Sequence, residues 1–292
     1  MRLLVTGGSG FLGGYVLSEA ARRGHDVMAL ARSPAAAGIV ASLGAEPVTG
    51  DLDEPGPLRD VFAAASCDAL VNLSSLGFGH AAAIITATRQ ADIARAVFVS
   101  TTAVTTRLPA PSKRIRLAAE QQIRDSPLQW TILRPTMIYG AAGDRNLSRL
   151  LALLSRARLL PVPGGGRHLQ QPVHVADVAD AVLAAAERPA SSGMTYDVAG
   201  PEPLTFTELL RVCARAVASR ARFVPVPLSP VIALARGYEM VSQHPPIRAE
   251  QLQRLAEDKA FAIDTAVRGL GYAPRPFADG IHAEARALGL AR

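Results

Sequence analysis

The sequence is poor in lysine, in cysteine and in long apolar runs. Lys113 and Lys259 are its only lysines, and arginine supplies the rest of the positive charge behind a net charge of +6. The basic residues are scattered and form no stripe, which argues against nucleic-acid binding. Cys67 and Cys213 lie far apart and show no metal-ligand spacing, so we expect no metal site and a reducing compartment.

Membrane-spanning and secreted proteins are also disfavoured. The nearest approach to a membrane segment, Phe223 to Ala235, is too short for a bilayer and contains three prolines. A strand-like run begins within the first few residues and leaves no room for a secretory signal. Hydrophobic residues make up 49% of the 292 positions, which is ample for a buried core. We therefore expect a globular cytoplasmic protein without a membrane span.

A glycine-rich turn near the N-terminus is the strongest signal that is present. It reads Gly7-Gly8-Ser9-Gly10-Phe11-Leu12-Gly13. The strand-like run Leu3–Thr6 precedes it, and a helical stretch and a second strand, His25–Leu30, follow. Gly7 permits the tight turn, Gly10 lets backbone approach a pyrophosphate, and Gly13 lets the helix pack closely on the strand. The unpaired N–H groups of the helix N-terminus can bind a phosphate. This context therefore favours a dinucleotide-binding turn over a purely structural turn.

Strands and helices alternate through the first half of the chain. Helices are expected near 35–43, 56–65, 80–94 and 113–125, with strands ending at Val48 and covering 69–73, 96–100 and 130–133. Such alternation predicts an α/β fold with a doubly wound parallel sheet, the Rossmann fold. We predict a dinucleotide-binding domain over 1–143, with 171–199 returning to its sheet. Loops rich in Pro and Gly then predict a smaller C-terminal substrate-binding subdomain, or lid, from 144–170 and 200–292.

Residues at the strand ends supply further candidate cofactor contacts, because ligands of open α/β sheets bind beyond the carboxyl ends of the strands. Arg32 and Ser33 follow the second strand, where a basic side chain accommodates the 2′-phosphate of NADP. NADP is therefore favoured over NAD, although Arg32 also suits an ordinary surface charge. The remaining candidates are Asp51, Leu52, Leu73, Ser74, Ser75, Thr101 and Pro135. Taken singly these signals are weak, because Ser and Asp commonly cap helices.

An ordered set of motifs then resembles a known superfamily. The motifs are Thr6–Gly13, Gly50-Asp51-Leu52, Val99–Thr102, Leu117–Glu120, Leu133–Gly140 and Val173–Ala179. In this set the chain is similar to the extended and atypical short-chain dehydrogenase/reductases, the superfamily of nucleotide-sugar epimerases and dehydratases. The resemblance implies a Rossmann domain that holds NAD(P) and a variable C-terminal region that shapes the substrate pocket. It also implies an oxidoreductase or epimerase/dehydratase activity on a sugar nucleotide or a small carbonyl compound.

The reaction centre of that superfamily is a Tyr-x-x-x-Lys pair assisted by Ser or Thr, and the chain departs from it. Thr102 suits the Ser/Thr position, but alignment on Leu117–Glu120 puts Ser112 at the tyrosine and Arg116 at the lysine position. A serine hydroxyl needs a base of its own. Arg116 can hydrogen-bond a ribose or a phosphate, but with a pKa above about 12 it is a poor proton carrier.

Two other side chains are candidate substitutes, and each also has an ordinary structural interpretation. Lys113 is either a catalytic amine or a solvated charge, and Tyr139 is either a proton donor or a packed phenol. His174 suits a core or dimer-interface position better than a catalytic one. Two hypotheses therefore stand: an NADP-dependent enzyme acting on a small molecule, and a non-catalytic NADP-binding redox sensor or accessory subunit.

Substrate and assembly are the least determined properties. Gln170-Gln171-Pro172 lies where extended members often carry an arginine and an aromatic residue associated with nucleotide sugars. Arg145, Arg149 and Arg167 either clamp a diphosphate or are surface charges. Members of the superfamily often dimerise through two helices, so the resemblance implies a homodimer through the helices near 80–94 and 113–125.

Overall fold

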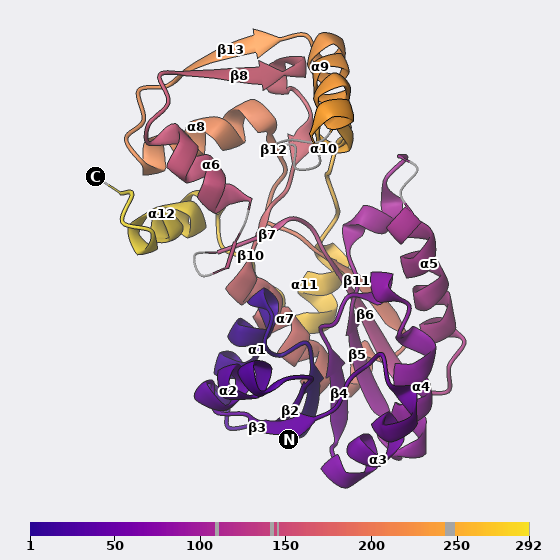
Figure 1. Ribbon diagram of the computed structural model, residues 1–292. Helices are drawn as coiled ribbons and strands as arrows, with labels where there is room; N and C mark the ends of the chain where they lie inside the picture. Colours follow the sequence, from indigo (N-terminus) through magenta and orange to yellow (C-terminus); the bar gives the residue numbers. More distant parts are fainter. Residues whose placement is uncertain (109–110, 141–142, 145, 243–248, 292) are drawn as a thin grey trace.

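The computed structural model describes residues 1–108, 111–140, 143–144, 146–242 and 249–291. Its larger part is a seven-stranded sheet whose paired strands all run parallel (Figure 1). In sheet order the strands are β11 (Met194–Val198), β6 (Gln129–Pro135), β5 (Arg95–Val99), β4 (Ala69–Asn72), β1 (Arg2–Thr6), β2 (Asp26–Ala31) and β3 (Glu46–Thr49). The predicted doubly wound α/β Rossmann fold is confirmed.

Helices cover both faces of this sheet. On one face lie α1 (Phe11–Arg22), α2 (Pro34–Ser42), α7 (Val175–Glu187) and α11 (Asp264–Leu270), and on the other α3 (Pro55–Ala65), α4 (Ala81–Gln90) and α5 (Pro111–Arg124). Side chains alternate between the faces of a strand. In β1, accordingly, Leu3 and Val5 join the first core and Leu4 joins the second. Burial on both sides explains the continuously apolar character of the strand.

A smaller part of the molecule, the lid, has a core of its own. Its elements are α6 (Leu147–Leu154), β8 (Leu159–Pro163), β9 (Leu169–Gln170), β12 (Leu204–Thr205), α8 (Phe206–Ala216), β13 (Arg222–Val226), α9 (Leu228–Val241), α10 (Ala249–Arg254) and α12 (Phe277–Ala287). Leu151, Leu209 and Ile281 are buried together where α6, α8 and α12 meet. Two short strands, β7 (Ile138–Tyr139) and β10 (Val173–His174), pair at the base of the lid.

Two segments lie in a different part of the molecule from the one that the sequence predicted. β11 joins the main sheet beside β6, but Val173–His174 pairs with β7 in a separate two-stranded sheet. Residues 264–272, which were expected in the lid, pack on the main sheet, where Leu270 and Tyr272 share a core with Tyr196. The physical reason is that β11 and α7 expose an apolar face that α11 covers.

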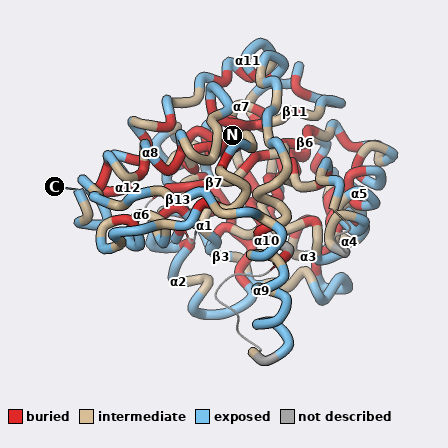
Figure 2. Tube along the Cα trace, turned by 90° about the horizontal axis from the view of Figure 1, so that it is seen from above, coloured by how far each residue is buried: buried red, intermediate tan, exposed pale blue. Residues whose placement is uncertain are grey.

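The segment that most resembled a membrane span forms β13 and α9. No helix among the described residues is both long and apolar enough to cross a bilayer. Most of α9 is nevertheless exposed, as the pale trace in Figure 2 shows. Leu234 is 76% and Met240 88% exposed. The helix therefore presents apolar side chains to solvent.

A buried carboxylate fixes α5 against the sheet. Glu120 is wholly buried and accepts hydrogen bonds from Ser100, from Arg124 and, through both oxygens, from Arg134. Burial alone raises the pKa of Glu120, but the bonds from Arg134 and Ser100 outweigh it and hold the pKa below the usual glutamate value. The ionised form is therefore the one that the fold stabilises.

We expect Glu120→Gln to lower the free energy of unfolding by about 3 kcal/mol, because the guanidinium of Arg134 loses its buried counter-charge. Because the pKa of Glu120 is lowered in the folded state, its contribution is complete above the unfolded-state pKa. It is lost as pH falls through the folded-state value. The difference between parent and variant should therefore shrink in urea titrations at progressively lower pH.

Asp60→Asn is the matched control, since Asp60 forms an exposed pair with Arg59. It should change the free energy of unfolding by less than about 0.5 kcal/mol. Equal losses in the two variants would contradict the role assigned to Glu120.

Candidate functional site

The glycine turn packs closely on the protein's own backbone and leaves the N-terminus of α1 uncapped. Gly7 has φ +73°, and a Cβ there would lie 2.9 Å from the backbone nitrogen of Ser74. A Cβ on Gly13 would lie 2.3 Å from the carbonyl oxygen of Gly8. Gly10 is the N-cap of α1, and no side chain caps this helix end. The first turn of α1 therefore keeps its positive end for an anionic ligand such as a pyrophosphate.

A buried hydrogen bond holds the strand ends beneath this turn. Thr6 donates to the side-chain oxygen of Asn72 over 2.6 Å, which ties the end of β1 to the end of β4. Four predicted cofactor residues at neighbouring strand ends stabilise the turns that follow those strands, because the side-chain oxygen of each accepts a hydrogen bond from a backbone N–H two or three residues later. The pairs are Ser33 with Ala36, Asp51 with Asp53, Ser75 with Gly77 and Thr101 with Ala103. These turns place Leu52, Leu73 and Ser74 at the same edge of the sheet as the glycines.

Arg32 lies directly after β2, at the position that meets the adenosine ribose in dinucleotide folds. Its side chain is exposed, and among the described residues no carboxylate pairs with it. A guanidinium in this state can take a 2′-phosphate without breaking an existing ion pair.

The residues at the superfamily's reaction positions lie after β5 and on α5. Thr102 is 7% exposed and its hydroxyl donates to the carbonyl of Pro135 over 3.3 Å. On α5, Arg116 donates to the hydroxyl of Ser112 over 2.9 Å. Burial lowers the pKa of Arg116, and the charge of Arg254 lowers it further. Ser112 and Arg116 thus stand together where tyrosine and lysine are expected, but they bond to each other.

The other two catalytic candidates face different surroundings. The ammonium of Lys113 donates to the backbone carbonyl of Thr106. Tyr139 is 1% exposed and belongs to the lid core, where a Cβ on Gly280 of α12 would meet its hydroxyl oxygen at 2.1 Å. Burial strongly raises the pKa of Tyr139. The placement of Tyr139 favours the packed phenol over a proton donor.

His174 has a structural position, as its apolar context suggested. Its Nδ1 accepts from the backbone of Ala176 at the start of α7, and its ring packs edge-on against Tyr15 and Tyr139. Burial, with a further contribution from the charge of Arg275, lowers the pKa of His174 to about 4. The imidazole is therefore neutral at physiological pH.

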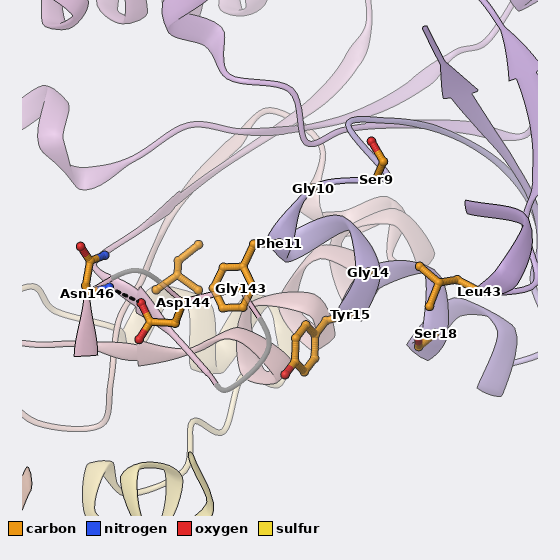
Figure 3. A pocket seen from close by; sticks show the side chains of 11 residues that line it. Ser9, Gly10, Phe11, Gly14, Tyr15, Ser18, Leu43, Gly143, Asp144 and Asn146 are labelled. Atoms are coloured by element: carbon orange, nitrogen blue, oxygen red, sulfur yellow. Dashed lines mark hydrogen bonds between the residues drawn. The ribbon is translucent and has the colours of Figure 1, made fainter. Parts of the chain in front are cut away.

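A pocket of about 910 Å³ opens beside the glycine turn, between α1 and the start of the lid. Figure 3 shows Phe11, Tyr15 and Asp144 around it. The ring of Phe11 meets Gly143, whose φ is +94° and whose Cβ would lie 3.1 Å from that ring. Phe11, predicted as a cofactor residue, thus turns its side chain toward the lid. Its backbone stays in the first turn of α1.

The residues proposed to clamp a diphosphate do not form a cluster. Arg149 and Arg167 are both exposed, and no contact joins them among the described residues; Arg145 lies outside those residues. The side-chain amide of Gln171 donates to the backbone carbonyls of Gly200 and Phe261, and its oxygen accepts from the Phe261 N–H. Gln171 therefore has a structural role at the position where a substrate-binding arginine was considered.

Sequence reasoning did not find the lid segment that meets the reaction end. Glu257 accepts hydrogen bonds from the hydroxyl of Thr106 and from the backbone of Arg107. Lys259, two residues further on, donates to the side-chain oxygen of Gln170 over 3.3 Å. These contacts span about 90 to 150 residues of sequence, and no local pattern predicts them. In the sequence, Lys259 is distinguished only as one of two lysines, which does not predict its contacts.

The glycine turn and the converging strand ends define a Rossmann-type dinucleotide-binding protein. Residues 7–189 match the family model described as NAD(P)H-binding, and the chain belongs to that family. The resemblance to the short-chain dehydrogenase/reductase superfamily is confirmed.

Relatives extend the similarity over nearly the whole chain. The 4-hydroxy-2-methyl-3-oxo-4-farnesyl-3,4-dihydroquinoline-1-oxide ketoreductase of Stigmatella aurantiaca is 31% identical over 94% of this chain and 92% of its own. The mitochondrial NADH dehydrogenase (ubiquinone) 1 alpha subcomplex subunit 9 of Arabidopsis thaliana is 29% identical, covering 90% and 70%. A UDP-glucose 4-epimerase structure with NAD, from Thermus thermophilus, has a TM-score of 0.75 at 19% identity, with 99% of both chains covered.

We expect Gly13→Ala to weaken NADPH binding at least about 10-fold and to lower stability, because a methyl group meets backbone carbonyls that cannot withdraw. Gly14→Ala, the next position of the same helix, is the control. Its Cβ would meet only the side chain of Leu43, at 3.8 Å. Fluorescence titration with NADPH and thermal melting distinguish the two. Similar behaviour of both variants would show that close packing at Gly13 is not required.

Proposed function

We propose that the protein reduces a ketone carried on a largely apolar molecule, with NADPH as the reductant. The observation that carries the proposal is the position of Thr102. Its buried side chain follows β5, two strands from β1 in the same parallel sheet, and therefore lies at the edge of the sheet where the uncapped N-terminus of α1 also begins. The similarity to a ketoreductase over nearly the full length of both chains supports a reduction.

Each part of the crevice has a separate task in this proposal. The turn from Gly7 to Gly13 and the N-terminus of α1 hold the pyrophosphate, and Arg32 holds the 2′-phosphate. When bound, the nicotinamide supplies a hydride for the carbonyl carbon. The Thr102 hydroxyl, whose present bond to Pro135 is long at 3.3 Å, can turn to donate to the substrate oxygen. Arg116 is placed to bind the ribose, but it cannot serve as the proton source at neutral pH.

An apolar substrate fits the lid better than a sugar nucleotide does. The exposed arginines of the lid form no diphosphate clamp among the described residues, and Gln171 is bound to backbone. By contrast α9, which packs on α10, exposes Leu234, Tyr238 and Met240. The farnesyl group in the name of the Stigmatella ketoreductase substrate is a relevant precedent for such a chain.

A non-catalytic accessory role is the second candidate. It is favoured by the bond between Ser112 and Arg116, which takes up both positions of the family's proton relay. The relative named as a subunit of mitochondrial NADH dehydrogenase adds weight to it. Tight NADPH binding without turnover on any ketone would select this alternative.

We expect Arg32→Gln to weaken NADPH binding about 10- to 100-fold, because one charge-assisted contact with the 2′-phosphate is lost. NADH lacks that phosphate, so its dissociation constant should change less than about 3-fold. Arg59→Gln, which removes an exposed arginine on α3, is the control and should leave both constants unchanged. An equal loss of affinity for NADPH and NADH would show that Arg32 does not bind the 2′-phosphate.

Turnover is tested by following NADPH absorbance with 2-decanone, ethyl 2-hexyl-3-oxobutanoate and UDP-glucose as candidate substrates. We expect oxidation with the two ketones, and a fall in kcat of about 100-fold in Thr102→Val because a donor to the developing oxyanion is removed. Thr195→Val, in the edge strand β11, should keep the parent rate. Absence of NADPH oxidation with every compound would overturn the reductase proposal.

A further inference from the structure

Arginines that are scattered in the sequence meet at the outer end of the lid. Neither the stretch 145–176 nor the stretch 209–238 contains an aspartate or a glutamate, although both contain several arginines. The two stretches include β8 and β13, which lie at the end of the lid away from the main sheet (Figure 1). At this end of the molecule the two stretches therefore contribute positive charge and no negative charge.

Two backbone connections bring the arginines of the two stretches together. The Ser219 hydroxyl donates to the carbonyl of Leu154 over 2.5 Å, which joins the turn after α8 to the end of α6. The N–H of Arg222 donates to the carbonyl of Arg158 over 2.9 Å, where the β8–β13 pair begins. The exposed arginines at or beside these turns are Arg156, Arg158, Arg215, Arg220 and Arg222. Among the described residues, no carboxylate forms an ion pair with any of them.

The outer face of the β8–β13 pair carries apolar side chains between these arginines. Leu160 and Phe223, which are paired across the two strands, pack on the lid core. Because side chains alternate between the faces of a strand, Leu159 and Val224 point away from that core. Leu159 is 63% and Val224 43% exposed. The outer face therefore combines aliphatic side chains with guanidinium groups, and neither strand contains a carboxylate.

Helix α9 extends the apolar surface from the end of this pair. It begins two residues after β13 ends, and a Cβ on Gly164, which follows β8, would lie 3.9 Å from the Cβ of Leu228. Leu234 and Tyr238 are four positions apart, so they lie on the same side of the helix, and both are exposed. Exposed apolar side chains are thus grouped beside the arginines, which is typical of an interaction surface.

This combination fits the surface of an anionic lipid bilayer better than it fits other partners. Guanidinium groups bind lipid phosphates, while aliphatic side chains enter the boundary between headgroups and acyl chains. A nucleic acid would contact the arginines, but its bases stack on aromatic side chains and not on aliphatic ones. A second copy of the chain, related by a two-fold axis, would bring arginines against arginines.

We propose that the outer end of the lid, formed by the β8–β13 pair with its flanking arginines and by α9, binds the surface of an anionic membrane. The protein lies on the bilayer without spanning it. Leu159 and Val224 enter the headgroup boundary, and Arg158 and Arg222 contact the phosphates beside them. The inference does not rest on the proposed ketone reduction, and its test needs no turnover.

Sedimentation with sucrose-loaded vesicles measures this binding directly. We expect the parent protein to bind vesicles of phosphatidylcholine that contain about 40% phosphatidylglycerol, and to bind phosphatidylcholine alone at least about 10-fold more weakly. Raising the NaCl concentration from about 0.05 M to about 0.5 M should weaken the binding to anionic vesicles at least about 10-fold, because salt screens exposed charges.

Two double variants separate the contribution of charge from that of apolar contact. Arg158→Gln with Arg222→Gln should weaken binding to anionic vesicles about 10- to 30-fold, because two contacts with headgroup phosphates are lost. Leu159→Thr with Val224→Thr keeps every charge and uses a residue that strands favour. It should weaken the binding about 5- to 10-fold, because less apolar surface enters the membrane.

Arg59→Gln with Ile39→Ser is the matched control, since it changes an exposed arginine and an exposed apolar residue of the Rossmann part. It should bind vesicles as the parent does. Melting temperatures and dissociation constants for NADPH should stay close to those of the parent in all three double variants, which excludes unfolding as the cause of weaker binding.

Four outcomes would overturn the proposal. The first is equal binding to vesicles with and without phosphatidylglycerol, and the second is parent-like binding in both lid variants. The third is tighter binding to a short DNA duplex than to anionic vesicles at the same salt concentration, which would assign the arginines to a nucleic acid. The fourth is a parent dimer in sedimentation velocity that Leu159→Thr with Val224→Thr dissociates, which would assign the face to a second copy.

Discussion

The carboxylate of Glu120 connects three segments that carry or adjoin the superfamily's reaction positions. It accepts from Ser100, which precedes Thr101 and Thr102, and from Arg134, which precedes Pro135. Pro135 in turn accepts the hydroxyl of Thr102. Glu120 itself lies one helical turn beyond Arg116 on α5. One buried anion thus sets the mutual positions of Thr102, Pro135 and Arg116, and its high desolvation cost makes any other arrangement of its partners unfavourable.

The glycine turn and the strand-end positions of the predicted cofactor residues could be predicted because their signals are local. Gly7 and Gly13 indicate the backbone conformation and the packing of one short turn. The continuously apolar sequence of β1 indicates that both of its faces are buried. Arg32 and Asp51 follow from the rule that ligands lie beyond the carboxyl ends of parallel strands. In each case the information needed was contained in one strand, one turn and the helix that follows.

The reaction half could not be predicted to the same extent, because its geometry depends on distant contacts. Tyr139 follows the sixth strand as a catalytic residue could, but α12, more than 130 residues later, covers its hydroxyl. The pairing of Val173 with Ile138 diverts β10 from the main sheet in the same way. Glu257 reaches Thr106 across 151 positions. Hydrophobic periodicity identifies an element but does not specify such partners.

The contact between the lid and the Rossmann part bears on the reaction positions of a chain that lacks the Tyr/Lys pair. In the superfamily pattern both groups lie on one helix, so the Rossmann part alone contains the relay. Here that helix carries Ser112 and Arg116, which bond to each other. Glu257 of the lid accepts hydrogen bonds from the Thr106 hydroxyl and the Arg107 N–H, in the loop that follows Thr102. The position of that loop therefore depends on contact between the two parts, which couples the conformation beside Thr102 to the docking of the lid.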